Sequence, residues 1–223
     1  MTKKLIIAVD GPSGVGKGTI SRRVAAALGY RHIDTGAMYR AVGWAALRAG
    51  VAVTAEADVA RVAQATTIEI DDARVAVDGR DIAADIRTPE MDRAASAVSQ
   101  LPRVRQILVD RQRALGADGG VVMEGRDIGT VVFPGADVKI YLDAAPEERA
   151  RRRATDTAHL GGQGMSLDAV ASEMAARDRA DSTRAASPLR PAEDAHVVDT
   201  TGASIDEVVK RVLEIVNRLK AEG

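Results

Sequence analysis

A nine-residue segment near the N-terminus has the composition of a phosphate-binding loop. Residues 11–19 read GPSGVGKGT and follow a short apolar run. A triphosphate is held by backbone N–H groups that approach it closely, and glycine permits this approach because it has no Cβ atom. Lys17 would add a positive charge between the β- and γ-phosphates, where negative charge redistributes during phosphoryl transfer. The segment predicts an ATP site made of Gly11, Pro12, Ser13, Gly14, Val15, Gly16, Lys17, Gly18 and Thr19.

The residue after Lys17 departs from the general G-x-x-x-x-G-K-[ST] pattern. Gly18 stands where the pattern has Ser or Thr, so the hydroxyl group is displaced to Thr19. We therefore expect Mg²⁺ to be held mainly by phosphate oxygens and water, with Thr19 as the one side chain to consider. The alternative is a glycine-rich turn with an incidental lysine, and the strand context and the spacing argue against it.

A phosphate loop alone does not distinguish a kinase from a GTPase, a motor ATPase or a nucleotide sensor. A GTPase needs an Asn-Lys-x-Asp guanine reader, which the sequence lacks. A motor would usually need a much larger domain. A nucleotide-binding regulator without turnover remains an alternative at this point.

Basic residues far along the chain suggest what accepts the phosphoryl group. The segments DTGAMYR at residues 34–40, EGRD at 124–127 and RDRADSTR at 177–184 each combine arginine with an acid. Joining two anions brings about six negative charges together, and guanidinium groups neutralise them better than ammonium groups. A single helical arginine would more often be a solvated partner of a nearby acid. The whole set beside a phosphate loop favours a site for a monophosphate acceptor.

The apolar pattern predicts the elements that position these residues. Residues 5–9 read as a buried strand, residues 17–28 as a helix ended by Gly29, and residues 31–34 as a second strand. Three further strands are expected at residues 121–123, 138–142 and 197–198. An acid follows each strand, which suggests a shared site at the carboxyl edge of a parallel sheet: Asp10, Asp34, Glu124, Asp143 and Asp199.

Three other segments complete the predicted organisation. The last helix should begin with the capping box Ser204–Glu207 and present one apolar stripe, from Ile205 to Leu219, to the sheet. Residues 67–71 and 74–78 alternate apolar with polar around a short turn and predict an inserted hairpin facing solvent. Residues 156–164 have no apolar periodicity and are a candidate mobile lid.

Composition excludes several classes of protein. The chain of 223 residues has a formal charge of −1, so no overall charge recruits nucleic acid. It has no cysteine and only three scattered histidines, which argues against disulfides, a cysteine nucleophile and a zinc site. No apolar run reaches the length of a signal-peptide core or a membrane span, so we expect a cytoplasmic protein without membrane contact.

These motifs resemble those of the nucleoside monophosphate kinases, and among them the bacterial cytidylate kinases. The resemblance covers essentially the full chain and includes GPSGVGKGT, DTGAMYR, IRTPE at residues 86–90, PRVR at 102–105 and SPLRPA at 187–192. The most specific match is EGRDIGTVVFP at residues 124–134. Thr35 and Glu124 stand where the family often has Ser and Asp, and both substitutions keep the functional group.

The resemblance implies a fold. It is an α/β P-loop NTPase fold of three α/β/α layers with a five-stranded parallel sheet, forming one domain over residues 1–223. The core would be residues 1–36, 102–153 and 165–223. A monophosphate-binding lobe would cover about 37–101, with an insert at about 67–85, and a short lid about 154–164.

The resemblance also implies an activity and its residues. ATP with Mg²⁺ would phosphorylate CMP and dCMP, a reaction of pyrimidine metabolism, in a protein that we expect to be a monomer. Arg149 and Arg153 would join the phosphate loop at ATP. Ser96, Arg105 and Asp127 would read cytosine, while Thr35, Arg40, Arg126, Arg177, Asp181 and Arg184 would hold the rest of CMP; the catalytic set would be Lys17, Arg126, Arg177 and Arg184.

The base assignment has a physical basis. Cytosine offers a 4-amino donor to a carboxylate such as Asp127, and its N3 and O2 acceptors suit a guanidinium such as Arg105. Uracil would place a carbonyl against Asp127, so UMP should be a poor substrate. A related small-molecule kinase that uses UMP or a shikimate-type acceptor remains the alternative.

Overall fold

The computed structural model describes residues 4–71, 74–156 and 165–222, and its core is a five-stranded parallel sheet. The strand order is β2-β6-β1-β7-β8, and the predicted five-stranded parallel sheet is confirmed. The strands are β1 Ile6–Asp10, β2 Arg31–Asp34, β6 Val121–Gly125, β7 Val138–Asp143 and β8 His196–Asp199. All five predicted strands are confirmed. β1 begins and ends one residue later than expected, so Asp10 belongs to the strand.

Helices cover both faces of the sheet. Successive side chains of the central strand β1 point to opposite faces, and from Ile6 to Val9 those on each face are apolar. Ile7 and Val9 pack with α1 Lys17–Leu28 and α8 Ile205–Glu222 on one face. Ala8 packs on the other face with Val109 of α5 Pro102–Gly116 and with η1 Ile128–Val132. The three-layer α/β/α prediction is confirmed. The element η1 is a single π-helical turn that the sequence did not predict.

The apolar stripe of α8 differs from the prediction at its first residue. The capping box is present, since Ser204 Oγ accepts from the Glu207 N–H and the Glu207 carboxylate accepts from the Ser204 N–H at 2.8 Å. Val208, Val212 and Val216 are buried as expected. Ile205 is 48% exposed because it is the first helical residue and precedes the turns that pack on the sheet.

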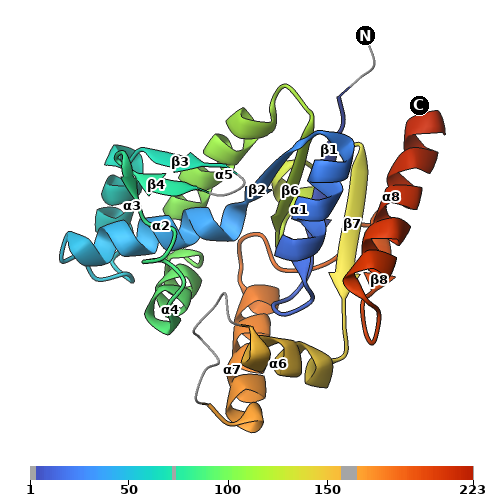
Figure 1. Ribbon diagram of the computed structural model, residues 1–223. Helices are drawn as coiled ribbons and strands as arrows, with labels where there is room; N and C mark the ends of the chain where they lie inside the picture. Colours follow the sequence, from blue (N-terminus) through green and yellow to red (C-terminus); the bar gives the residue numbers. More distant parts are fainter. Residues whose placement is uncertain (1–3, 72–73, 157–164, 223) are drawn as a thin grey trace.

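A second group of helices and strands stands beside the β2 edge of the sheet (Figure 1). It contains α2 Thr35–Arg48, α3 Glu56–Ala65 and α4 Pro89–Val98. The lobe was expected at about residues 37–101, and α2 begins two residues before that range. A small antiparallel sheet joins β3 Ile68–Ile70, β4 Val75–Val77 and β5 Arg80–Asp81. The predicted hairpin is thus extended by a third short strand, and its turn at 72–73 lies outside the described residues. One face of it is buried, since Val77 packs with Ile68 and Ile70 against Ala37 and Ala41 of α2.

Two helices, α6 Pro146–Thr155 and α7 Leu167–Thr183, pack on each other at the carboxyl end of the sheet (Figure 1). α6 continues to Thr155, so residues 154 and 155 of the lid expected at about 154–164 belong to this helix. Its residues 157–164 lie outside the described residues. No helix in the described part of the chain is both long and apolar enough to cross a membrane.

Candidate active site

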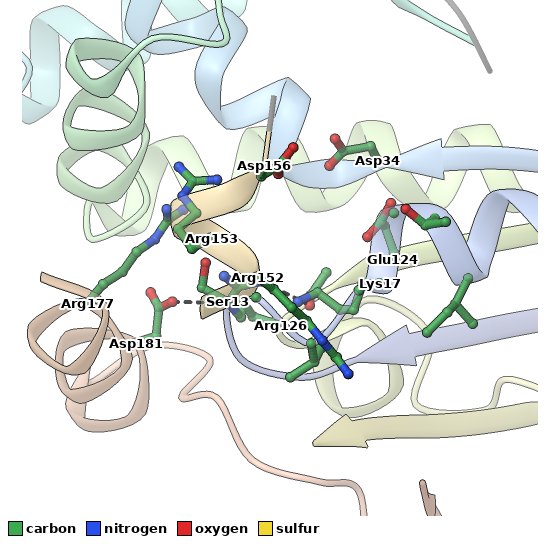
Figure 2. A pocket seen from close by; sticks show the side chains of 18 of the residues that line it. Ser13, Lys17, Asp34, Glu124, Arg126, Arg152, Arg153, Asp156, Arg177 and Asp181 are labelled. Carbon is green, nitrogen blue, oxygen red and sulfur yellow. Dashed lines mark hydrogen bonds and ion pairs between the residues drawn. The ribbon is translucent and has the colours of Figure 1, made fainter. Parts of the chain in front are cut away.

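A cavity of about 610 Å³ opens at the carboxyl ends of the strands. The phosphate loop, α2, α4, β6, α6, α7 and the start of α8 all contribute residues to it. In Figure 2, Lys17 and Glu124 lie on the side formed by the sheet, while Arg153 and Arg177 lie toward α6 and α7. Arginine side chains from α6 and α7 therefore face the loop across the cavity, together with the acids Asp156 and Asp181.

The loop has the backbone that its glycines allow. Gly11 has φ +148°, and a Cβ atom there would lie 2.1 Å from the Leu142 carbonyl oxygen, so only glycine fits. Gly14 and Gly16 have φ +80° and +90°. Lys17 Nζ donates to the carbonyl oxygens of Gly11 at 2.8 Å and Pro12 at 2.7 Å, across the loop that it belongs to.

Lys17 is poised electrostatically for an anion. The pKa of Lys17 is lowered to about 7, chiefly by burial and next by repulsion from Arg126, while attraction to Glu124 and Asp10 acts in the opposite direction. A bound polyphosphate would place negative charge beside this ammonium group and raise its pKa again. The free energy of binding is therefore coupled to the protonation of Lys17.

Arg149 supports the loop from outside the cavity. Its Nη1 donates to the Ser13 carbonyl oxygen at 3.2 Å and pairs with Asp178, whose other oxygen accepts from the Ser13 N–H at 3.4 Å. Arg149, Gly11 and Pro12 are the three predicted ATP residues that do not line the cavity. Ser13 to Thr19 and Arg153 do line it.

All nine residues predicted to bind the acceptor line this same cavity, although they come from five different elements or loops: Thr35, Arg40, Ser96, Arg105, Arg126, Asp127, Arg177, Asp181 and Arg184. Two acids organise the basic residues among them. The buried Asp127 pairs with Arg105 and lies 3.9 Å from Arg184 Nη2. Asp181 accepts from Arg126 Nε at 3.1 Å and lies 3.7 Å from Arg184 Nη1.

Donors in this part of the cavity are left without partners. Arg105 Nε and Arg184 Nη2 are buried and have no hydrogen-bond partner among the described residues. Burial also lowers the pKa of Arg184, with repulsion from Arg105 next in size. Buried guanidinium nitrogens that lack acceptors indicate that a ligand with acceptor atoms belongs there.

Thr35 and Arg40 already have protein partners in this structure. The Thr35 hydroxyl donates to the Glu124 carbonyl oxygen at 2.7 Å, and Arg40 Nη2 donates to Asp34 at 2.9 Å. The Asp34 carboxylate also caps α2 by accepting from the Ala37 N–H at 3.1 Å. The end of β2 thereby fixes the start of α2 and the direction of Arg40.

The expectation that five strand-end acids share one site is wrong for three of them. Asp34 and Glu124 line the cavity, but Asp143 and Asp199 are exposed at the β7–β8 side of the sheet. Asp10 is buried and accepts from the Ile128 and Gly129 N–H groups of η1 at 2.8 and 2.7 Å. Strand position alone could not tell which carboxylates turn toward the crevice.

The structure adds cavity residues that the sequence did not identify. Thr200, Ala203 and Ile205, between β8 and α8, line one end of the cavity, and Arg152 Nη1 donates to Thr200 Oγ1 at 2.9 Å. Their place directly after a strand was the available signal. Asp92 on α4 also lines the cavity, and nothing in its sequence context marked it.

The donor set fits a magnesium ion held with few protein ligands. Thr19 is exposed and lines the cavity, and a Cβ atom at Gly18 would lie 3.4 Å from Glu124 Oε1. Glu124 is held by His32 Nε2 at 2.8 Å. No cluster of three or more His, Cys, Asp or Glu suited to a metal occurs among the described residues. Such a site would leave most coordination positions to phosphate oxygens and water.

This fold and site define a P-loop kinase. The structure of a gluconokinase from Sinorhizobium meliloti 1021 is similar over 100% of this chain and 97% of its own, with a TM-score of 0.54 and 16% identity. A shikimate kinase from Bacteroides thetaiotaomicron is similar over 96% and 98%, with a TM-score of 0.52 and 12% identity. These likenesses establish the fold.

The chain belongs to the cytidylate kinase family, a family of phosphotransferases. The family model described as cytidylate kinase matches residues 7–218. A cytidylate kinase of Desulfitobacterium hafniense is 48% identical over 97% of this chain and 94% of its own length. One of Anoxybacillus flavithermus is 47% identical over 100% of both chains. The family resemblance predicted from the motifs is confirmed.

Proposed function

We propose that this protein transfers the γ-phosphoryl group of ATP to CMP and dCMP, giving ADP with CDP and dCDP. The observation that carries the proposal is the buried group formed by Asp127, Arg105 and Arg184. A carboxylate able to accept from an amino group lies there beside guanidinium donors that lack acceptors. This combination suits the 4-amino group, N3 and O2 of cytosine.

Positioning and charge neutralisation would account for the reaction. The acceptor phosphate is already an anionic nucleophile, so no general base is required. Lys17 would stabilise the charge that develops between the β- and γ-phosphates. Arg126, Arg177 and Arg184 line the same cavity and would neutralise the two phosphate groups as they approach.

The opposite end of the cavity supports a site for the donor base. Ala203 and Ile205 offer apolar surface there, beyond the loop that would hold the phosphates. Mg²⁺, when bound to the phosphates, would neutralise part of their charge, with Thr19 and Glu124 as the nearby protein oxygens. Ile205, which is exposed at the start of α8, would form part of that apolar surface.

A coupled ADP-release assay over CMP, dCMP, UMP, AMP and shikimate tests the proposal. We expect kcat/KM for CMP to exceed that for UMP by roughly 100-fold, because uracil would leave the buried Asp127 carboxylate facing a carbonyl. Faster turnover of UMP, AMP or shikimate at matched concentrations would contradict the assignment.

A variant pair sharpens this test. Asp127→Asn should narrow the ratio of CMP to UMP by about tenfold or more, since an amide can donate to the uracil carbonyl. Asp110→Asn makes the same change on the exposed face of α5 and should leave the ratio unchanged. An unchanged ratio in Asp127→Asn would remove this residue from base recognition.

A further inference from the structure

Asp92 is one of the acids that line the cavity, and it is surrounded there by arginines. It lies in the first turn of α4, which Thr88 caps by accepting from the Met91 N–H at 3.3 Å. Its side chain is only 15% exposed. Acids are favoured in the first turn of a helix, but a carboxylate serving only the helix dipole would be expected on the solvent side. The burial of Asp92 therefore needs another explanation.

Three guanidinium groups from three helices surround this carboxylate. Asp92 pairs directly with Arg153 of α6, and its Oδ1 lies 3.7 Å from Arg177 Nη1 of α7 and 3.9 Å from Arg40 Nη1 of α2. Among the described residues, it is the one acid within 4 Å of Arg153 and of Arg177. Figure 2 shows Arg153 and Arg177 approaching each other from different helices. The carboxylate thus lies where guanidinium groups from separate elements converge.

The same arginines are those assigned to substrate phosphates. Arg40 and Arg177 are proposed to hold the acceptor phosphate and Arg153 the donor, so this step rests on the proposed function. A carboxylate presents two oxygens to a guanidinium group much as a phosphate does. The Asp92 carboxylate and a substrate phosphate therefore compete for the same guanidinium N–H groups.

We propose that Asp92 is an internal counter-ion that substrate phosphate must displace from Arg153, Arg177 and Arg40. In the free protein, it offsets the repulsion among arginines that are gathered in a partly buried cavity. On binding, a phosphate with a larger charge takes over these donors, and breaking the contacts of Asp92 lowers the net affinity. Asp92 thereby limits affinity for the phosphate group and has no effect on recognition of the nucleoside.

The alternative is a structural role, in which the ion pairs of Asp92 hold α4 against α6 and α7 in the arrangement that binds substrate. If Asp92 has this structural role, its removal would weaken the binding of all ligands. Removal of a competing counter-ion would strengthen the binding of phosphate-bearing ligands alone. The sign of the change and its dependence on the phosphate separate the two roles.

Isothermal titration calorimetry with CMP, cytidine and inorganic phosphate tests the proposal on the wild type, Asp92→Asn and Glu90→Gln. Glu90 is an exposed acid in the same turn of α4, so Glu90→Gln removes the same charge outside the cavity. We expect Asp92→Asn to bind CMP and phosphate about two- to fivefold more tightly, the range of a partly exposed ion pair. Cytidine binding should not change, and Glu90→Gln should match the wild type.

Weaker or unchanged binding of CMP by Asp92→Asn would overturn the proposal, as would an equal gain for cytidine. If Asp92→Asn does not fold, Asp92→Ser, with a residue well tolerated near helix N-termini, carries the same expectations. If the wild type does not select CMP, the proposed function fails. The phosphate titration still tests the counter-ion, because it does not depend on the nucleoside.

Discussion

Lys17 has properties that a motif cannot convey. The GK pair predicts an ammonium group beside phosphate, but the structure shows that this group is buried near Arg126, which lowers its pKa to about 7. The unfolded chain then binds more protons than the folded chain between pH 7 and 10.5. Because of this difference, the contribution of Lys17 makes the fold more stable as pH rises through that window.

We predict that ATP binding takes up a proton at Lys17. At pH 8, the free side chain is largely neutral and the phosphates are fully ionised, so binding should capture up to about one proton and ATP affinity should fall as pH rises above 7. Calorimetry with Mg²⁺ and ATP in HEPES and in Tris measures the uptake. Lys17→Met should lose it, and its turnover should fall by orders of magnitude with the fold intact.

Equal proton uptake in the wild type and Lys17→Met would show that another group titrates. Lys17→Arg is the matched control, because it keeps the positive charge and cannot exchange a proton at this pH. It should show no uptake. Binding of ATP by Lys17→Arg should then be independent of pH between 7 and 9.

The positions of cavity residues were predictable where a motif marked them, while their roles stay predictions. The nine acceptor residues came from short motifs spread between residues 35 and 184, and the fold brings them to one cavity. Asp92 could not be found in this way, because an acid in the first turn of a helix is ordinary in sequence. Its environment depends on Arg153 and Arg177, which arrive from other helices.

At the scale of elements, the most informative difference is the π-helical turn η1. The strands and α1 followed from apolar runs and glycine stops. The segment Ile128–Val132 reads IGTVV, which has no clear apolar periodicity and is compatible with several structures. Its geometry depends on a distant group, the Asp10 carboxylate, which accepts both Ile128 and Gly129 N–H groups. The sequence did not predict β5 either. This strand is only two residues long, Arg80 and Asp81, and two polar residues give no apolar pattern.

We predict that Asp10 positions Asp127 through η1. Asn at position 10 can accept only one of the two N–H bonds and turns its own NH₂ toward the other, so η1 and the adjacent Asp127 should shift. Asp10→Asn should raise KM for CMP roughly tenfold, the equivalent of one charge-assisted hydrogen bond of about 1.5 kcal/mol, and change KM for ATP less. Steady-state kinetics with each substrate varied measures this.

A pH series on Asp10→Asn separates positioning from general destabilisation. Burial raises the pKa of Asp10 to about 6, so the folded chain binds more protons than the unfolded chain between pH 3.8 and 6, and stability from this group falls as pH rises there. In chemical unfolding, the free energy of unfolding of Asp10→Asn should lack this fall between pH 3.8 and 6. Asp143→Asn, at the exposed end of β7, should keep both this fall and the wild-type KM. A normal KM for CMP in Asp10→Asn would disprove the positioning role.

At the scale of the whole molecule, charge is distributed unevenly. The chain has 31 Lys and Arg against 32 Asp and Glu, so its net charge does not attract anions. The cavity nevertheless gathers Arg40, Arg126, Arg153, Arg177 and Arg184 from segments far apart in sequence. The composition predicted that the net charge would not attract anions. The positive charge of the cavity could be seen only once the fold brought these arginines together. The oligomeric state depends on surface contacts that composition does not describe, so the expected monomer stays a prediction.

We predict that salt weakens CMP binding even though the protein is slightly negative overall. Raising ionic strength from 50 to 300 mM should increase KM for CMP roughly two- to fivefold, because screening acts on the partly exposed arginines of the cavity. Arg177→Gln should flatten this dependence. Arg61→Gln removes an equal charge at an exposed pair with Asp58 in α3 and should keep the wild-type slope. Parallel salt dependences in the two variants would mean that the net charge of the chain, rather than the gathered arginines, sets the attraction for the acceptor.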